Sequence, residues 1–381
     1  VRQRSGILSL ASPETSTPVS DPPNMTKAIA KLFLTAASVA LCTSLQAQTT
    51  ITITADRDAT LYESNNGTLA NGAGPSIFVG VTAQPGKRRA LLHFDVAGQI
   101  PAGARVLSVE LDSFSAQSTA FLPIATYVHR VTQDWNEGSA FASGPGGAGT
   151  FAGNGSATWI HTSRGTPGAT WNTPGGDFDP QPSFIFDLAS VGPSTATVQP
   201  GMVNDVQSWL DNPTGNFGWI LKTDEVMWPT ARRMHSRESS LGSLPRITVT
   251  YLIPGQVGNY GTGWLVNGSP FQLDISGTAD GNAPMPIVYN NAPSPLTVGA
   301  NFISFGLDPV GPTLPFGDSV YLSLSGPVIT GDVFTLVGGS GFSLFNIPSG
   351  FPGYLITLQA VAIDTNLLGF SLSNAGVLLT Q

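Results

Sequence analysis

Cysteine is almost missing from this sequence, and its absence excludes several kinds of site. The one cysteine, Cys42, lies in a short apolar segment that has the pattern of an export signal. We expect the chain that follows that segment to have no disulfide, no thiol nucleophile and no thiolate metal site. Large exported domains without disulfides depend on their cores, and a cysteine-free exported β-protein is more typical of bacteria.

Charged residues are also scarce, at 10% of the chain, and acids outnumber bases to give a formal net charge of -8. A general nucleic-acid binder needs a basic field, so this balance argues against that class. None of the four histidines is spaced as His-x-x-x-His, and the sequence lacks a Gly-x-Ser-x-Gly elbow and a phosphate-binding glycine loop. His93 and His129 fall within expected strands and are predicted to be structural.

Residues 25–47 have the order of a secretory signal peptide: two lysines, an apolar run, then small and polar residues ending at Ala47. Cleavage is expected after Ala47, and Leu41 stands where a lipoprotein would need a small residue. Residues 1–24 are polar and proline-rich, which indicates an extension ahead of a true start at Met25. The apolar run is too short to span a membrane, and no other segment is long and apolar enough.

The rest of the chain divides sharply by charge. Residues 48–254 carry twelve basic and sixteen acidic residues, whereas residues 255–381 contain no Lys, Arg, His or Glu. Such a shift indicates a domain boundary, and Pro254–Gly255 is a plausible hinge. We therefore expect two domains after the export segment.

Both parts read as strands joined by turns. Residues 106–114 alternate strictly, with Leu107, Val109 and Leu111 on one face and polar residues on the other. Further strands are expected at residues 76–81, 89–96, 126–131, 184–188, 217–222, 245–251, 320–326, 332–338 and 353–364. Many short strands with regular turns are typical of an all-β sandwich or barrel, here a larger sandwich followed by a smaller one.

One segment departs from the strand pattern. Residues 200–213 place Val203, Val206 and Leu210 at helical spacing and end at a proline. This pattern predicts one short helix packed on a sheet, with Trp209 in the core.

Residues 132–180, called here the Gly-rich stretch, are the most informative part of the chain. A long loop is uncommon unless it is functional or disordered, and the tryptophans Trp135, Trp159 and Trp171 argue against disorder. Exposed indole faces could stack on sugar rings, with Arg164 among the polar groups available for hydroxyls. The alternative is that the three tryptophans pin the stretch to the sandwich.

The same stretch offers candidate metal ligands. Asp177 and Asp179 flank Phe178, and carboxylates one residue apart in a glycine-rich loop can bind a hard cation such as calcium, with Glu137 as a third ligand. The alternative is that the aspartates cap turns. A carboxylate pair for glycoside hydrolysis is a further alternative.

A basic segment follows at residues 232–238. On a strand, Arg233, His235 and Arg237 would share one face and Met234 would point inward. Two outward arginines would form a receptor for carboxylate or sulfate groups. The alternative is a solvated face with local ion pairs.

Six segments occur in an order that resembles the DNRLRE domain family, which is similar to carbohydrate-binding module family 96. They are DRDATLYES (56–64), RALLHFDV (89–96), IPAGARVLSVEL (100–111), VTQDWNEG (131–138), VQSWLDNPTGNFGWILKTDE (206–225) and HSRESSLGSLPRITVTY (235–251). The resemblance implies a jelly-roll-like β-sandwich that is usually an appendage of secreted or surface proteins. Characterised relatives bind polysaccharide, including the polyuronate alginate.

The family's name-giving segment corresponds to Arg233–Glu238, which here reads RMHSRE, and the Gly-rich stretch is longer than in the family. Residues 353–381 resemble the end of a β-module found at the C-termini of exported proteins from environmental bacteria.

Three functions remain open at this point. The leading expectation is a secreted or cell-surface, non-catalytic protein whose residues 48–254 bind extracellular or cell-wall polysaccharide, such as an acidic one like alginate. The first alternative is a structural or adhesive surface protein that binds no sugar. The second is a polysaccharide lyase or glycosidase with a site that these patterns do not reveal.

Overall fold

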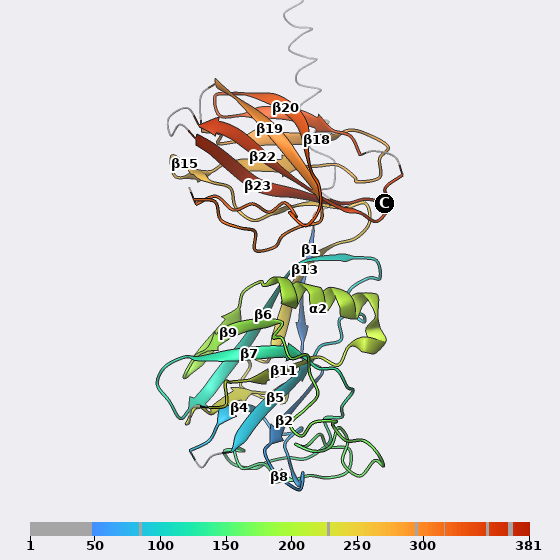
Figure 1. Ribbon diagram of the computed structural model, residues 1–381, viewed down its shortest axis with the longest axis vertical. Helices are drawn as coiled ribbons and strands as arrows, with labels where there is room; N and C mark the ends of the chain where they lie inside the picture. Colours follow the sequence, from blue (N-terminus) through green and yellow to red (C-terminus); the bar gives the residue numbers. More distant parts are fainter. Residues whose placement is uncertain are drawn as a thin grey trace, which may run out of the picture. The chain divides into compact units, whose positions relative to one another are not determined.

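The computed structural model describes residues 48–83, 86–226, 229–293, 296–315, 317–347, 350–364 and 369–381. The predicted export segment and the extension before it lie outside these residues. The described part is built of β-strands with one α-helix and one short 3-10 helix, which confirms the expected all-β class (Figure 1). None of the helices in the described residues is long and apolar enough to cross a membrane.

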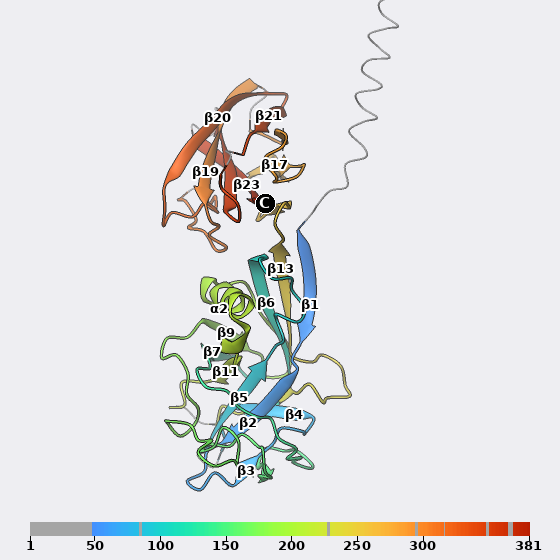
Figure 2. The same cartoon turned by 90° about the vertical axis from the view of Figure 1, so that its right-hand side faces the viewer.

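Eleven of the strands before residue 254 form one antiparallel sheet. They are β1 (Thr49–Thr54), β2 (Arg57–Tyr62), β4 (Ser76–Val81), β5 (Lys87–His93), β6 (Arg105–Ser118), β7 (Ile124–Arg130), β9 (Phe184–Leu188), β10 (Gly192–Ala196), β11 (Trp219–Lys222), β12 (Arg232–His235) and β13 (Arg246–Leu252). Their order is β1-β13-β6-β12-β4-β5-β11-β7-β9, with β10 beside β6 and β2 beside β5. The sheet curls strongly on itself (Figure 2).

Strand β6 shows how the sequence alternation buries one face of the sheet. Leu107, Val109 and Leu111 are fully buried, as the alternation predicted, while Glu110 between them is exposed. Removing such side chains from water stabilises the fold by roughly 1.5–3 kcal/mol each.

The predicted helix is present as α2 (Pro200–Asp211), and it is followed by the 3-10 helix η1 (Pro213–Gly215). Trp209 is buried, as predicted, and its ring centroid lies 4.9 Å from that of Trp219 on β11. The helix therefore supplies part of the main core.

The strands after residue 254 form separate sheets. They are β14 (Val257–Tyr260), β15 (Leu265–Val266), β16 (Ser269–Pro270), β17 (Gln272–Ile275), β18 (Met285–Asn290), β19 (Leu296–Phe305), β20 (Val328–Val337), β21 (Gly341–Phe345), β22 (Leu355–Asp364) and β23 (Gly369–Leu379). Five of them pair in the order β14-β23-β22-β19-β20, β17-β18-β21 form a second sheet, and β15 pairs with β16. The long apolar strand β22 is central, because it lies between β23 and β19.

The strand predicted at residues 320–326 is wrong. Leu322 makes one isolated bridge to Leu307, and two of the neighbouring N–H groups bond to side chains and not to a strand. The N–H of Tyr321 donates to Oε1 of Gln359, and the N–H of Ser323 donates to Oγ of Ser304.

Candidate functional site

The Gly-rich stretch covers the outer side of β2, β5 and β11. Regular structure within it is limited to β8 (Thr150–Phe151), which pairs with β3 (Leu69–Ala70), and to isolated bridges. Strand β5 explains this layering, because Leu91 packs against the stretch while its neighbours Ala90 and Leu92 face the main core. The sheet is thus buried on both faces here.

All three tryptophans of the stretch are buried. Trp135, Trp159 and Trp171 retain 1%, 7% and 4% of their exposed surface. The indole N–H of Trp135 donates to the carbonyl of Phe217, and that of Trp171 donates to the carbonyl of Thr158. The expected exposed indole faces are therefore wrong, and the alternative applies, in which these rings pin the stretch to the sheet.

One glycine shows how tightly the stretch is packed. Gly175 has a φ of +98°, and a Cβ at this position would lie 2.6 Å from Nη1 of Arg89 and 2.8 Å from the ring of Trp159. No other residue type fits there without a shift.

Arginine side chains hold the backbone of the stretch. Four donate to its carbonyl oxygens: Arg57 Nη1 to Trp135 (2.6 Å), Arg88 Nε to Gly147 (3.1 Å), Arg89 Nη1 to Gly175 (2.7 Å) and Arg164 Nη1 to Ala152 (2.6 Å). A fifth, Arg237, pairs with Glu137. Arg164, a predicted ligand contact, also lies over the ring of Phe151 at 4.7 Å, so its guanidinium is held by the protein itself.

Arg89 is the most enclosed of these anchors. Its guanidinium makes two hydrogen bonds with Glu225, at 2.7 and 2.8 Å, and stacks over Trp159 at 4.8 Å. The side chains of both partners are largely buried, at 11% and 7% exposure. A bidentate pair of this kind fixes geometry as well as charge.

The predicted outward row of Arg233, His235 and Arg237 is not formed, because β12 ends at His235. The ring of His235 is buried, stacks on Phe114 at 4.7 Å, and has Nδ1 2.9 Å from the carbonyl of Gly242. Arg233 is half-buried, and Arg237 lies beyond the strand end. The expected basic face is therefore wrong, although Met234 does point inward, as predicted.

The three predicted metal ligands also do not come together. The carboxylate of Asp177 accepts the backbone N–H groups of Asn172 (2.7 Å) and Thr173 (2.9 Å), which is the turn-capping alternative. Asp179 is exposed, and Glu137 lies in a different group of acids. The predicted calcium site at these three residues is therefore wrong.

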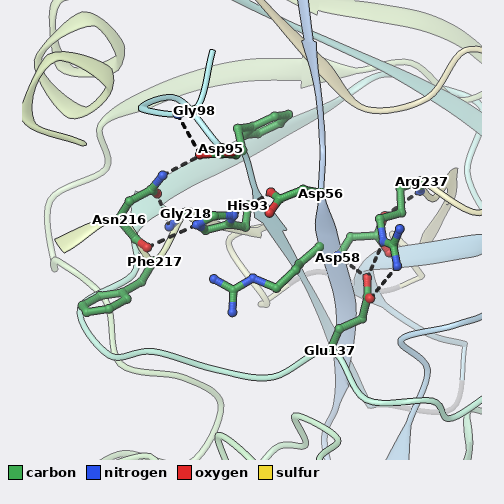
Figure 3. Close-up of polar contacts among 12 residues, drawn as sticks. Asp56, Asp58, His93, Asp95, Gly98, Glu137, Asn216, Phe217, Gly218 and Arg237 are labelled. Atoms are coloured by element: carbon green, nitrogen blue, oxygen red, sulfur yellow. Dashed lines mark hydrogen bonds and ion pairs between the residues drawn. The ribbon is translucent and has the colours of Figure 1, made fainter. Parts of the chain in front are cut away.

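Glu137 instead lies with Asp58 and Glu238, and we call these three residues the carboxylate cluster (Figure 3 shows Asp58 and Glu137). Glu137 Oε1 accepts the N–H of Asp58 at 2.7 Å, and Arg237 reaches both oxygens of Glu137 at 2.8 and 2.7 Å. Burial raises the pKa of Asp58 well above its ordinary value, and burial also raises the pKa of Glu238.

A second polar group in Figure 3 holds β2 and β5 to the segment before β11. His93 Nδ1 lies 2.6 Å from Oδ1 of Asp56, and His93 Nε2 lies 3.2 Å from the carbonyl of Asn216. Both ring nitrogens thus have protein partners, which agrees with the structural role predicted for this histidine.

A polar cleft of about 400 Å³ opens on the outer side of the stretch. Its walls are Arg89, Thr132, Asn172, Thr173, Pro174, Gly176, Asp177 and Phe178. Asn172 and Thr173 are exposed, while their backbone N–H groups are fixed by Asp177. The cleft therefore combines free side-chain hydroxyl and amide groups with a firmly held backbone.

A second hollow, of about 550 Å³, lies beside the connection between β6 and β7 and is mainly apolar. Phe121 and Leu122 at this connection are exposed. Its lining offers fewer groups that could bind hydroxyls than the polar cleft does.

Sequence reasoning missed Asp58 and Glu238 as members of the cluster. Both lie within the segments that resemble the DNRLRE family, yet nothing in their spacing places them beside Glu137. No protein-family model matches this chain, and no curated protein does either. The DNRLRE resemblance therefore stays a prediction.

Proposed function

We propose that residues 48–254 bind extracellular polysaccharide without cleaving it, and that the polar cleft is the binding site. The observation that carries the proposal is the cleft itself, where exposed Asn172 and Thr173 stand on a backbone fixed by Asp177. Sugar hydroxyls need donors and acceptors in fixed positions, and a site held before binding loses less entropy when the ligand arrives.

The charges around the cleft favour a neutral polysaccharide over an acidic one. Arg89, the guanidinium in its wall, is already paired through Nε and Nη2 with Glu225, and its Nη1 donates to the carbonyl of Gly175. The outward basic face that supported an acidic ligand is not formed, and the chain as a whole is acidic. Acidic chains such as alginate thus become the second arm of the test.

The test is affinity electrophoresis of the chain in gels that contain neutral or acidic polysaccharide. Asn172→Ala combined with Thr173→Val removes the side-chain groups and keeps the backbone N–H groups that Asp177 holds. Each lost hydrogen bond is worth roughly 0.5–1.5 kcal/mol, so we expect affinity for a neutral chain to fall about five- to 150-fold.

The matched control is Asn204→Ala combined with Thr52→Val, two exposed positions away from the cleft, which we expect to be retarded like the parent. Equal retardation of the cleft variant and the parent would show that the cleft is not the site. A parent that no polysaccharide retards would indicate the structural or adhesive alternative. Release of reducing ends or unsaturated uronates would indicate an enzyme.

A further inference from the structure

The carboxylate cluster joins three segments that are far apart in the chain. Asp58 lies on β2, Glu137 lies in the Gly-rich stretch, and Glu238 follows β12. One oxygen of each carboxylate lies within 4.8 Å of the others. Anything that binds these oxygens together therefore ties the stretch to the sheet.

The carboxylate cluster is short of positive charge. Among the described residues, Arg237 is the one basic side chain that forms ion pairs with these acids, at 2.7 Å from Glu137 and 2.8 Å from Glu238. Three carboxylates and one guanidinium leave a formal charge of about -2 when all are ionised. A single divalent cation would balance this charge.

Particular oxygen atoms are also left over. Asp58 is fully buried; its Oδ2 accepts the N–H of Arg237, but its Oδ1 has no hydrogen-bond partner among the described residues. Both carboxylate oxygens of Glu238 are buried and likewise lack a hydrogen bond, although Arg237 Nε lies 2.8 Å from one of them. A buried carboxylate oxygen without a partner is costly unless a cation or a proton satisfies it.

We propose that the carboxylate cluster binds a divalent cation, calcium in particular, through Asp58 Oδ1 and oxygens of Glu238 and Glu137. Carboxylate oxygens within 4.8 Å of one another can be bridged by one ion. Calcium takes six to eight oxygen ligands at about 2.3–2.6 Å in a flexible geometry, whereas magnesium demands a near-ideal octahedron and usually keeps several waters, so a set of three protein carboxylates favours calcium. This site keeps Glu137 from the sequence expectation and replaces Asp177 and Asp179 with Asp58 and Glu238.

The cation stabilises the Gly-rich stretch through Glu137, which lies two residues after the buried Trp135. Glu137 follows Trp135 and Asn136, and the Asn136 N–H donates to the carbonyl of Thr162. The position of Glu137 is therefore linked to two segments of the stretch, one around residue 136 and one around residue 162. A cation bound only by the folded chain raises the melting temperature by mass action.

The experiment is calorimetric titration of the full chain with Ca²⁺ after chelator treatment, with Mg²⁺ as the comparison. We expect one Ca²⁺ per chain, weaker Mg²⁺ binding, and a melting temperature about 5–10 °C higher at 100 times Kd than with chelator. Glu238→Gln should weaken Ca²⁺ binding at least about tenfold while the chain stays folded. Asp58→Asn should do the same, but its buried position makes Glu238→Gln the deciding variant.

Glu110→Gln on β6 and Asp179→Asn are the matched controls, and both should bind Ca²⁺ like the parent. The proposal is overturned if the parent takes up no Ca²⁺, or if Glu238→Gln binds it as tightly as the parent. Loss of binding in Asp179→Asn alone would move the site back to the aspartates of the stretch. The titration uses no glycan, so its result is separate from that of the polysaccharide test.

Discussion

Residues 48–254 and residues 255–381 both contain backbone N–H and C=O groups that lie outside the strand ladders and bond to side chains. The side chains that we compare here differ between the two parts. In the first part, arginines reach into the irregular stretch and donate to its carbonyls. In the second part, neutral amides do this work within a regular sheet. Gln359 accepts from the N–H of Tyr321 and donates to the carbonyls of Ser319 and Ser373.

This difference indicates what the arginine side chains of residues 48–254 do in the structure. Gln359 on β22 reaches the irregular backbone at Ser319 and Tyr321 with a short amide. The Gly-rich stretch is instead anchored by guanidinium groups, whose long stem and five donors reach its carbonyl oxygens. Arg57, Arg88, Arg89 and Arg164 therefore serve to anchor the backbone of the Gly-rich stretch.

The largest expected effect concerns Arg89. Arg89→Met leaves Glu225 buried without its partner, which costs about 3–5 kcal/mol, or roughly 6–20 °C in melting temperature. Arg246→Met removes an exposed pair with Asp112 (3.0 Å) and should cost at most about 1 kcal/mol. Thermal unfolding followed by circular dichroism compares the two. Equal losses would show that the enclosed arginine is not a special anchor and would break the comparison.

A smaller effect is expected at Asp318, a buried carboxylate in the part that has no basic residue. Its Oδ2 accepts the N–H of Leu372 at 2.8 Å, its Oδ1 has no hydrogen-bond partner in the described part of the chain, and burial raises its pKa. A raised folded-state pKa means that the stability contributed by this group is present below its unfolded pKa of about 3.9 and is lost as pH rises.

Asp318→Asn should therefore melt a few degrees above the parent at neutral pH, and the two curves should converge near about pH 4. Melting temperatures measured from acid to neutral pH check this, with the exposed Asp332→Asn as the control. A variant that is less stable than the parent at neutral pH would show that the ionised carboxylate is needed.

The sequence predicted the elements whose pattern is local. The alternation in residues 106–114, the helical spacing around Trp209 and the long apolar strand at 353–364 all led to the correct elements, because each signal lies within one segment. The strand expected at 320–326 is not formed, because the N–H groups of Tyr321 and Ser323 bond to the side chains of Gln359 and Ser304. Side-chain partners at that distance leave no local pattern.

The candidate site was harder to predict for the same reason. Arg89 and Glu225 are 136 residues apart, and Arg237 and Glu137 are 100 residues apart. The residue types in the Gly-rich stretch drew attention to it as the place of a candidate site. Whether a tryptophan faces solvent or the sheet depends on how the stretch folds back, and periodicity says nothing about that.

The central claim is that the Gly-rich stretch is a rigid platform for the cleft, and hydrogen exchange of its backbone tests this most directly. The N–H groups of Asn136, Arg164, Trp171 and Gly175 each donate to a carbonyl within the stretch. We predict that these amides exchange nearly as slowly as those of β5, and that Arg89→Met speeds exchange at Gly175 first. Exchange throughout the stretch at the rate of an open loop would contradict the account.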